Sequence, residues 1–168
     1  MSQSTGDARH ERGVDPDLRS LVQLANAFGL EQELVLVLPG LVVSGTLISA
    51  KAHFDELAGV LQGEDPEGTL RATLAARFRL RGERLAEWGA GSQLGDLDPE
   101  EPDAQDLEQM PEPDYVHLRN ATVVTWPRSG QVLPLWRGRL PDVVGWTVGD
   151  FHDTPTNTDT GTETGAGR

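Results

Sequence analysis

The sequence predicts an α+β fold in which five short strands form a small β-barrel with an N-terminal helix and an inserted helical, acidic region. Three observations support this prediction. Apolar residues recur at helical spacing in some segments, whereas other segments are strand-length aliphatic stretches bounded by turn residues. Glycines interrupt the strand segments, and closing five short strands into a barrel would remove exposed sheet edges.

The 168 residues are enough for one domain with tails. We expect disorder at residues 1–14 and 152–168, because both ends are polar and have few apolar residues to bury. Residues 15–151 are predicted to form a single α+β domain. Its insertion comprises helices at about 50–88 and a flexible loop at about 89–114, which carries nine Asp or Glu residues, four prolines and no Lys or Arg.

Two helices have clear start signals. Asp15 is suited to cap a helix over residues 16–28, because it precedes a first-turn proline, and Gly29 is suited to end that helix. Ser49 is a second capping residue, followed by apolar residues at helical spacing over residues 50–62. Both segments are therefore predicted to be amphipathic helices.

A β-hairpin is predicted between these helices. Residues 33–38 and 41–49 are rich in aliphatic residues and flank the turn dipeptide Pro39-Gly40. Because aliphatic side chains fall on both faces, we expect the strands to be buried on both sides or closed into a barrel. Gly45 within the second strand indicates a sharp bend or a close backbone approach.

A third helix is predicted to begin at Asp65-Pro66-Glu67. Its apolar stripe, drawn at 3.6 residues per turn, consists of Leu70, Leu74, Phe78, Leu85 and Trp88. Gly82 lies inside the helix, where we expect a break or a kink. After the acidic loop, three further strands are predicted up to residue 151.

Composition limits the classes of partner, chemistry and cellular location that this chain can have. The net charge of −13 disfavours nucleic acid and anionic membranes as partners. The absence of cysteine excludes disulfides and thiolate chemistry and is typical of a cytoplasmic protein. The longest apolar run, residues 34–43, is interrupted by proline and glycine and is about half the ~20 residues of a membrane helix. We therefore expect neither a membrane span nor a targeting signal.

Few residues are suited to catalysis or metal binding. The chain has no HExxH or GxSxG motif, so we expect no enzyme activity, no metal and no cofactor. His53 with Asp55 is the enzymatic alternative, but a spacing of two residues puts them on different helix faces. For His53 and His117 we expect surface or half-buried side chains.

Arginines and tryptophans are the better candidates, as partner-binding residues. Three tryptophans recur at a spacing of ten in the C-terminal part, where core packing is the default and an exposed tryptophan would be an interface anchor. Arginines surround the stripe of the third helix and flank a glycine in WRGRL. The candidate set is Trp126, Trp136, Arg137, Arg139, Arg77 and Arg81.

Three blocks together resemble the U-class gas vesicle accessory proteins (GvpU-like). They are SGTLISAKAHFD at 44–55, HLRN at 117–120 and WRGRLPDVVG at 136–145, in that order. The long acidic gap and the threonine-rich tail depart from the family pattern. The motif residues to which we assign structural roles are Ser44, Gly45, Phe54, Asp55, His117, Asn120, Gly138 and Gly145.

The resemblance implies a non-enzymatic, cytoplasmic helper of the gas vesicle, located on the vesicle surface. It also implies contacts with the vesicle shell, with other gas vesicle proteins or with further copies of the chain, in vesicle assembly or vesicle–vesicle clustering. The predicted barrel is itself similar to Sm-like and SH3-like barrels. An Sm-like nucleic-acid-binding module is therefore the alternative, although the negative charge disfavours it.

Overall fold

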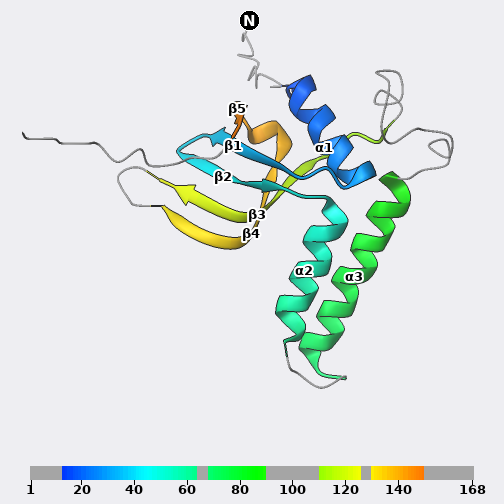
Figure 1. Ribbon diagram of the computed structural model, residues 1–168. Helices are drawn as coiled ribbons and strands as arrows, with labels where there is room; N and C mark the ends of the chain where they lie inside the picture. Colours follow the sequence, from blue (N-terminus) through cyan, green and yellow to red (C-terminus); the bar gives the residue numbers. More distant parts are fainter. Residues whose placement is uncertain (1–12, 64–67, 90–109, 126–129, 150–168) are drawn as a thin grey trace, which may run out of the picture.

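The computed structural model describes residues 13–63, 68–89, 110–125 and 130–149. Most of the predicted disordered ends and most of the predicted acidic loop fall outside these ranges. Val14, the last residue of the predicted disordered N-terminus, is described and packs against the core. In chain order the elements are α1 (Pro16–Phe28), β1 (Gln32–Leu38), β2 (Leu41–Leu47), α2 (Ala50–Gln62), α3 (Leu70–Gly89), β3 (Tyr115–Val124), β4 (Gln131–Arg139), the 3₁₀ helix η2 (Leu140–Asp142) and β5 (Gly145–Val148) (Figure 1).

The strands form an open antiparallel sheet in the order β4-β3-β2-β1-β5 (Figure 1). The α+β class is confirmed, but the barrel is wrong, because β4 and β5 are not paired within the described residues. Closure is not needed for burial, since Leu18 and Val22 of α1 join sheet residues such as Leu36 in one core cluster. Pro134 is exposed on β4, as suits an edge strand.

Helix α1 has the start and the end that the sequence predicts. The Asp15 carboxylate accepts hydrogen bonds from the N–H groups of Asp17 and Leu18 at 3.0 and 3.1 Å. Gly29 ends the helix with φ of 72°, in the left-handed region that glycine adopts without strain. The hydrogen-bonded ends fix the helix so that its apolar side faces the sheet.

Gly45 allows a close approach between β2 and β3, one of the two outcomes that the sequence predicts. A Cβ at this position would lie 2.9 Å from the carbonyl oxygen of Arg119 and 3.1 Å from Cα of Ala121. The β2–β3 register shifts between Ser44 and Thr46, opposite Asn120, which has a φ of 51°. Asparagine tolerates this conformation better than most residues, so the first two blocks supply the two halves of one β-bulge.

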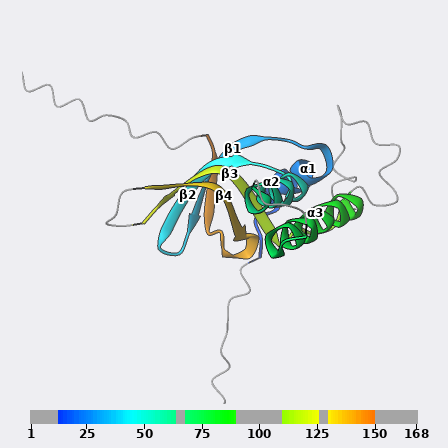
Figure 2. The same cartoon turned by 90° about the horizontal axis from the view of Figure 1, so that it is seen from below.

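Helices α2 and α3 lie side by side and extend beyond the sheet (Figures 1 and 2). The Ser49 hydroxyl accepts a hydrogen bond from the N–H of Ala52 at 3.1 Å, as predicted for a capping residue. Phe54, only 2% exposed, stacks on Phe78 of α3 with ring centroids 5.8 Å apart. The aromatic pair therefore holds the two helices together close to the sheet.

The apolar stripe predicted for α3 is wrong in its first half. Leu70 and Leu74 are 85% and 40% exposed, whereas Phe78 and Leu85 are partly buried and Ala75 is fully buried. The helix also continues through Gly82, where a Cβ would lie 3.3 Å from both the Lys51 carbonyl oxygen and Cβ of Phe54. Small residues thus form the contact face, because they let α3 approach α2 closely.

Two remaining expectations about α3 are limited by what the structure describes. The predicted start at 65–67 and the Trp88 side chain fall outside that part of the chain. Near the described start of α3, the Thr69 hydroxyl accepts a hydrogen bond from the N–H of Ala72 at 3.2 Å.

No helix within the described ranges has the length and apolar character needed to cross a membrane.

Candidate functional site

A cavity of about 140 Å³ lies where the segment before β3 meets α1, the start of α2, α3, β3 and β4. Pocket walls of this kind, with a few polar groups converging on one space, are typical of binding sites. The polar side chains along the wall include Gln23, Asn26, Arg81, Tyr115, His117 and Arg137.

Side chains of α1 fix two walls of this cavity. The Gln23 amide donates to the Met110 carbonyl oxygen at 3.3 Å, and Arg19 pairs with Glu112 at 3.0 Å. The side-chain oxygen of Asn26 accepts from the N–H of Ala50, the first residue of α2, at 2.8 Å. The segment before β3 and the start of α2 are therefore both held against α1.

Two arginines from distant parts of the chain lie over the Phe54 ring. Cζ of Arg81 on α3 is 5.1 Å from the ring centroid, and Cζ of Arg137 on β4 is 5.6 Å from it. Arg137 also stacks on Tyr115, with Cζ 3.5 Å from that ring centroid. Cation–π contacts orient both guanidinium groups without neutralising them.

His53 and His117 are buried, at 5% and 3% exposure, so the expectation of surface or half-buried histidines is wrong. Their ring centroids are 4.7 Å apart between α2 and β3. Burial, reinforced by the Arg137 charge, lowers the pKa of His53 to about 4. Burial, with His53 and the two arginines adding to it, lowers the pKa of His117 to about 3. Both rings are therefore neutral at pH 7.

Several nitrogens in this cluster have no hydrogen-bond partner among the described residues. They are Nδ1 of His53, both ring nitrogens of His117 and Nε of Arg137, all of which are buried. Burial lowers the pKa of Arg137, and the Arg81 charge lowers it further, while Tyr115 and Asp114 act in the opposite direction. The cavity wall therefore combines unsatisfied polar atoms with two cations that repel each other.

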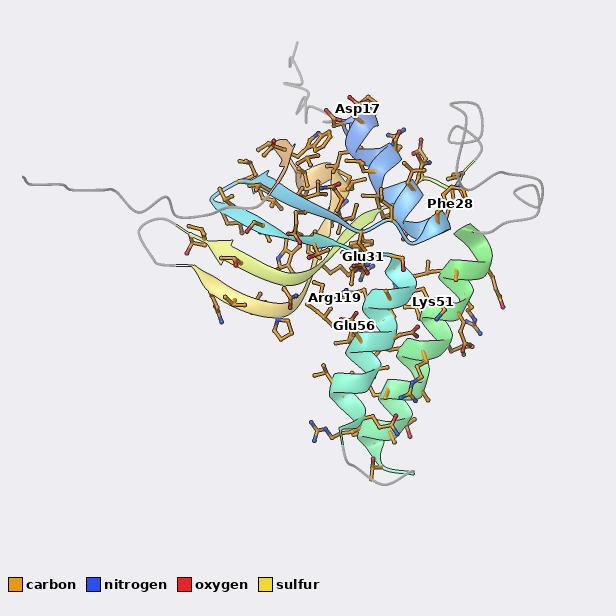
Figure 3. The ribbon with its side chains drawn as sticks, in the orientation of Figure 1. Asp17, Phe28, Glu31, Lys51, Glu56 and Arg119 are labelled. Atoms are coloured by element: carbon orange, nitrogen blue, oxygen red, sulfur yellow. The ribbon has the colours of Figure 1, made fainter. Side chains whose placement is uncertain are left out.

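A third arginine, on the neighbouring strand, is neutralised. Arg119 donates through Nε to Oε1 of Glu56 at 2.8 Å and through Nη1 to Oε1 of Glu31 at 3.2 Å, joining β3 to α2 and to the start of β1 (Figure 3). Such a two-carboxylate arrangement is a structural link.

The predicted partner-binding residues separate in the structure. Arg81, which is itself exposed, and the half-buried Arg137 both line the cavity, whereas the exposed Arg77 on α3 and Arg139 at the end of β4 do not. Trp136 is half-buried against the core, and its ring lies over Gly138, where a Cβ would be 2.1 Å from Cη2. Trp126 lies outside the described residues. The core-packing default holds for Trp136 and Trp146.

The motif residues not yet described lie in β2, α2 and β5. Ser44 is buried in β2, and Asp55 pairs with Lys51 one turn away at 2.5 Å. A Cβ at Gly145 would meet only Cβ of Val37 at 3.9 Å, so nothing in the structure explains a glycine there.

Sequence reasoning missed Gln23, Asn26 and Tyr115 as parts of the site. Of these three residues, Gln23 has the clearest sequence signal for burial, because it is a polar residue beside Val22 in a helix with a buried apolar side. In the structure Gln23 is only 6% exposed. Asn26 and Tyr115 give none, since their roles depend on which elements meet.

The wall of the site combines both charges with apolar residues. In the part of the chain that the structure describes, no group of three or more His, Asp or Glu side chains could hold a metal ion. Arg81 and Arg137 would repel a cation. Beside them the lining holds the carboxylates of Glu112 and Asp114 and apolar residues such as Leu85.

Comparison with known proteins identifies the relationship. A family model described as "GvpU-like: Gas vesicle protein GvpU-like" matches residues 15–151, a range that contains all three sequence blocks. No curated protein and no solved structure matches the chain.

Proposed function

The chain belongs to the GvpU-like family of gas vesicle proteins, and on that premise we propose that it is a non-enzymatic accessory protein acting on vesicle assembly or vesicle–vesicle clustering. It does so in the cytoplasm, at the vesicle surface, through protein–protein contacts. The family match supports the link to vesicles, and the outer face of α3 is the observation that carries the role of protein contacts.

The outer face of α3 mixes leucines with arginines. Leu70 and Leu80 are 85% and 46% exposed. Arg77 and Arg84 are also exposed, and at 3.6 residues per turn all four fall within an arc of about 80°. Leucine burial supplies affinity at an interface and arginine supplies directional contacts, so this face suits a protein surface that is apolar and acidic.

The other predicted partner-binding residues remain part of the proposal. Arg139 is exposed beside the half-buried Trp136 at the edge strand β4. Together with Arg137 they form a second candidate contact region, for vesicle proteins or for another copy of the chain. Trp126, which lies outside the described residues, remains a candidate for the same role.

Flotation with purified gas vesicles tests the contact. Vesicles rise on centrifugation, so a bound accessory protein is recovered in the floating layer. We expect Leu80→Ser and Arg77→Glu each to reduce the recovered fraction several-fold. Val132→Ser is the matched control, because Val132 is 70% exposed on β4, away from α3. Equal recovery of all variants would reject α3 as the contact face.

The acidic segment is proposed to tune attraction between vesicles through its charge. Residues 90–109 contain seven Asp or Glu residues and no Lys or Arg. Deleting them should change vesicle clustering, counted by electron microscopy, more at low salt than at high salt. Unchanged clustering at both salt concentrations would reject this role.

The nucleic-acid alternative has lost its structural support. It depended on similarity to an Sm-like barrel, and the sheet is open. An electrophoretic shift of a fluorescent oligonucleotide at low salt, weakening steeply with added salt, would revive it.

A further inference from the structure

The cavity beside β3 and β4 contains positive charge that the described residues do not neutralise. Arg81 and Arg137 approach it from α3 and β4, and neither guanidinium forms an ion pair with a carboxylate in the described ranges. Their charges repel each other enough to help lower the pKa of Arg137. Folding rarely retains facing cations in a partly buried space without an opposite charge to join them.

A buried histidine lies behind the same space. His117 lines the cavity at 3% exposure, and neither ring nitrogen has a hydrogen-bond partner among the described residues. Both nitrogens are closed off from solvent, so the ring contributes a desolvated wall beside the two arginines. An anion beside such a wall would be attracted to the arginines more strongly than it would be in open water.

The start of α2 adds to the positive potential. Ala50, its first residue, lines the cavity, and α2 runs from there for 13 residues. The N-terminal end of a helix carries a partial positive charge that favours anions. Here it reinforces the two arginines.

Acidic residues at the cavity oppose an anion, but one is already engaged. Glu112 is paired with Arg19 of α1. Asp114 is exposed and only partly offsets the Arg137 charge, since burial and Arg81 together still lower the pKa of that arginine. The lining thus holds two arginines and two carboxylates, and an excess of positive charge at the cavity depends on the pairing of Glu112 with Arg19.

We propose that this cavity binds a compact oxyanion, held by the Arg81 and Arg137 guanidinium groups beside the buried ring of His117. A carboxylate side chain of a partner protein and a free phosphate share this chemistry, because both accept paired N–H donors from arginine. The volume of about 140 Å³ suits one such group. The assignment does not depend on the vesicle role.

Calorimetric titration of the full chain tests the site. Inorganic phosphate and a tri-glutamate peptide are titrated separately, at constant ionic strength set with sodium chloride. We expect saturable binding that Arg137→Gln and Arg81→Gln each weaken at least tenfold. Tighter binding of the peptide would identify a protein carboxylate as the natural ligand, and tighter binding of phosphate would identify a free anion.

Arg79→Gln is the matched control, because Arg79 is exposed on α3, does not line the cavity and is not part of the proposed contact face. It should bind both probes within twofold of the unmodified chain. Urea unfolding of each variant confirms that it is folded. No saturable binding of either probe, or equal weakening by Arg79→Gln, would overturn the proposal. Since no vesicles are present, either result leaves the accessory function to be judged by flotation.

Discussion

Arg119 and Arg137 lie on neighbouring strands of one sheet, but only Arg119 is paired with carboxylates. Arg119 on β3 is hydrogen-bonded to Glu31 and Glu56. Arg137 on β4 faces Arg81 and packs on aromatic rings. An arginine that is ion-paired with carboxylates joins structural elements. A half-buried arginine without such an ion pair indicates a place for a ligand.

The largest expected effect concerns the histidines beside Arg137. Their pKa values are about 4 and about 3 in the folded chain, against 6.5 as the ordinary value. As pH falls through 6.5 the unfolded chain takes up protons first, so stability is full above about 6.5 and is lost toward the folded values. Between pH 7 and pH 5 we expect a loss of about 2 kcal/mol per histidine.

Urea unfolding at the two pH values measures this loss. His117→Leu should remove its share of the pH dependence, and His53→Leu the other share. Ionised carboxylates mostly titrate below pH 5, so they contribute little in this range. A stability that is the same at pH 7 and pH 5 would show that the rings are hydrated and that the cavity is not a low-dielectric site.

A second prediction concerns the bulge that places Arg119. Gly45→Ala would push a methyl group against the Arg119 carbonyl oxygen, 2.9 Å away, and we expect a loss of about 2 kcal/mol in the free energy of unfolding. Gly59→Ala is the matched control, because a Cβ there meets nothing within 4 Å and α2 should gain up to about 1 kcal/mol. Similar results for both would mean that β2 and β3 separate easily.

Local signals in the sequence predicted much of this structure. The cap at Asp15, the cap at Ser49 and the special role of Gly45 were recognised, because each depends on residues close together in the chain. The first half of the apolar stripe of α3 failed for the opposite reason. Leu70 and Leu74 would be buried only if a partner covered them, and α2 instead meets Phe78 and Gly82.

The cavity was harder to predict than the elements around it. Arg81 and Arg137 were each chosen as partner-binding candidates, but their convergence over Phe54 depends on how α3, α2 and β4 meet. The barrel was predicted because closing five short strands would remove exposed sheet edges. Sequence alone did not show that α1 would pack on the sheet and bury its apolar residues without closure.

Arg119→Gln tests how much the paired arginine contributes to stability. The change leaves Glu31 and Glu56 near each other without their common cation, so we expect a loss of about 1 kcal/mol, measured by urea unfolding. High salt should reduce this loss, because screening weakens the repulsion between the two carboxylates. Arg19→Gln, which breaks one exposed pair with Glu112, should cost less. A larger loss for Arg19→Gln would contradict the structural role of Arg119.

Arg137→Gln should have the smallest effect on stability, about 0.5 kcal/mol or less, because the lost contact with the Tyr115 ring is offset by relief of the repulsion from Arg81. The same urea experiment, without phosphate, measures it. With phosphate at saturation the unmodified chain should gain stability and the variant should not, since only a ligand-binding native state is favoured. A loss as large as that of Arg119→Gln in the absence of phosphate would mean that Arg137 is a structural residue like Arg119, and that the positive charge at the cavity serves the fold.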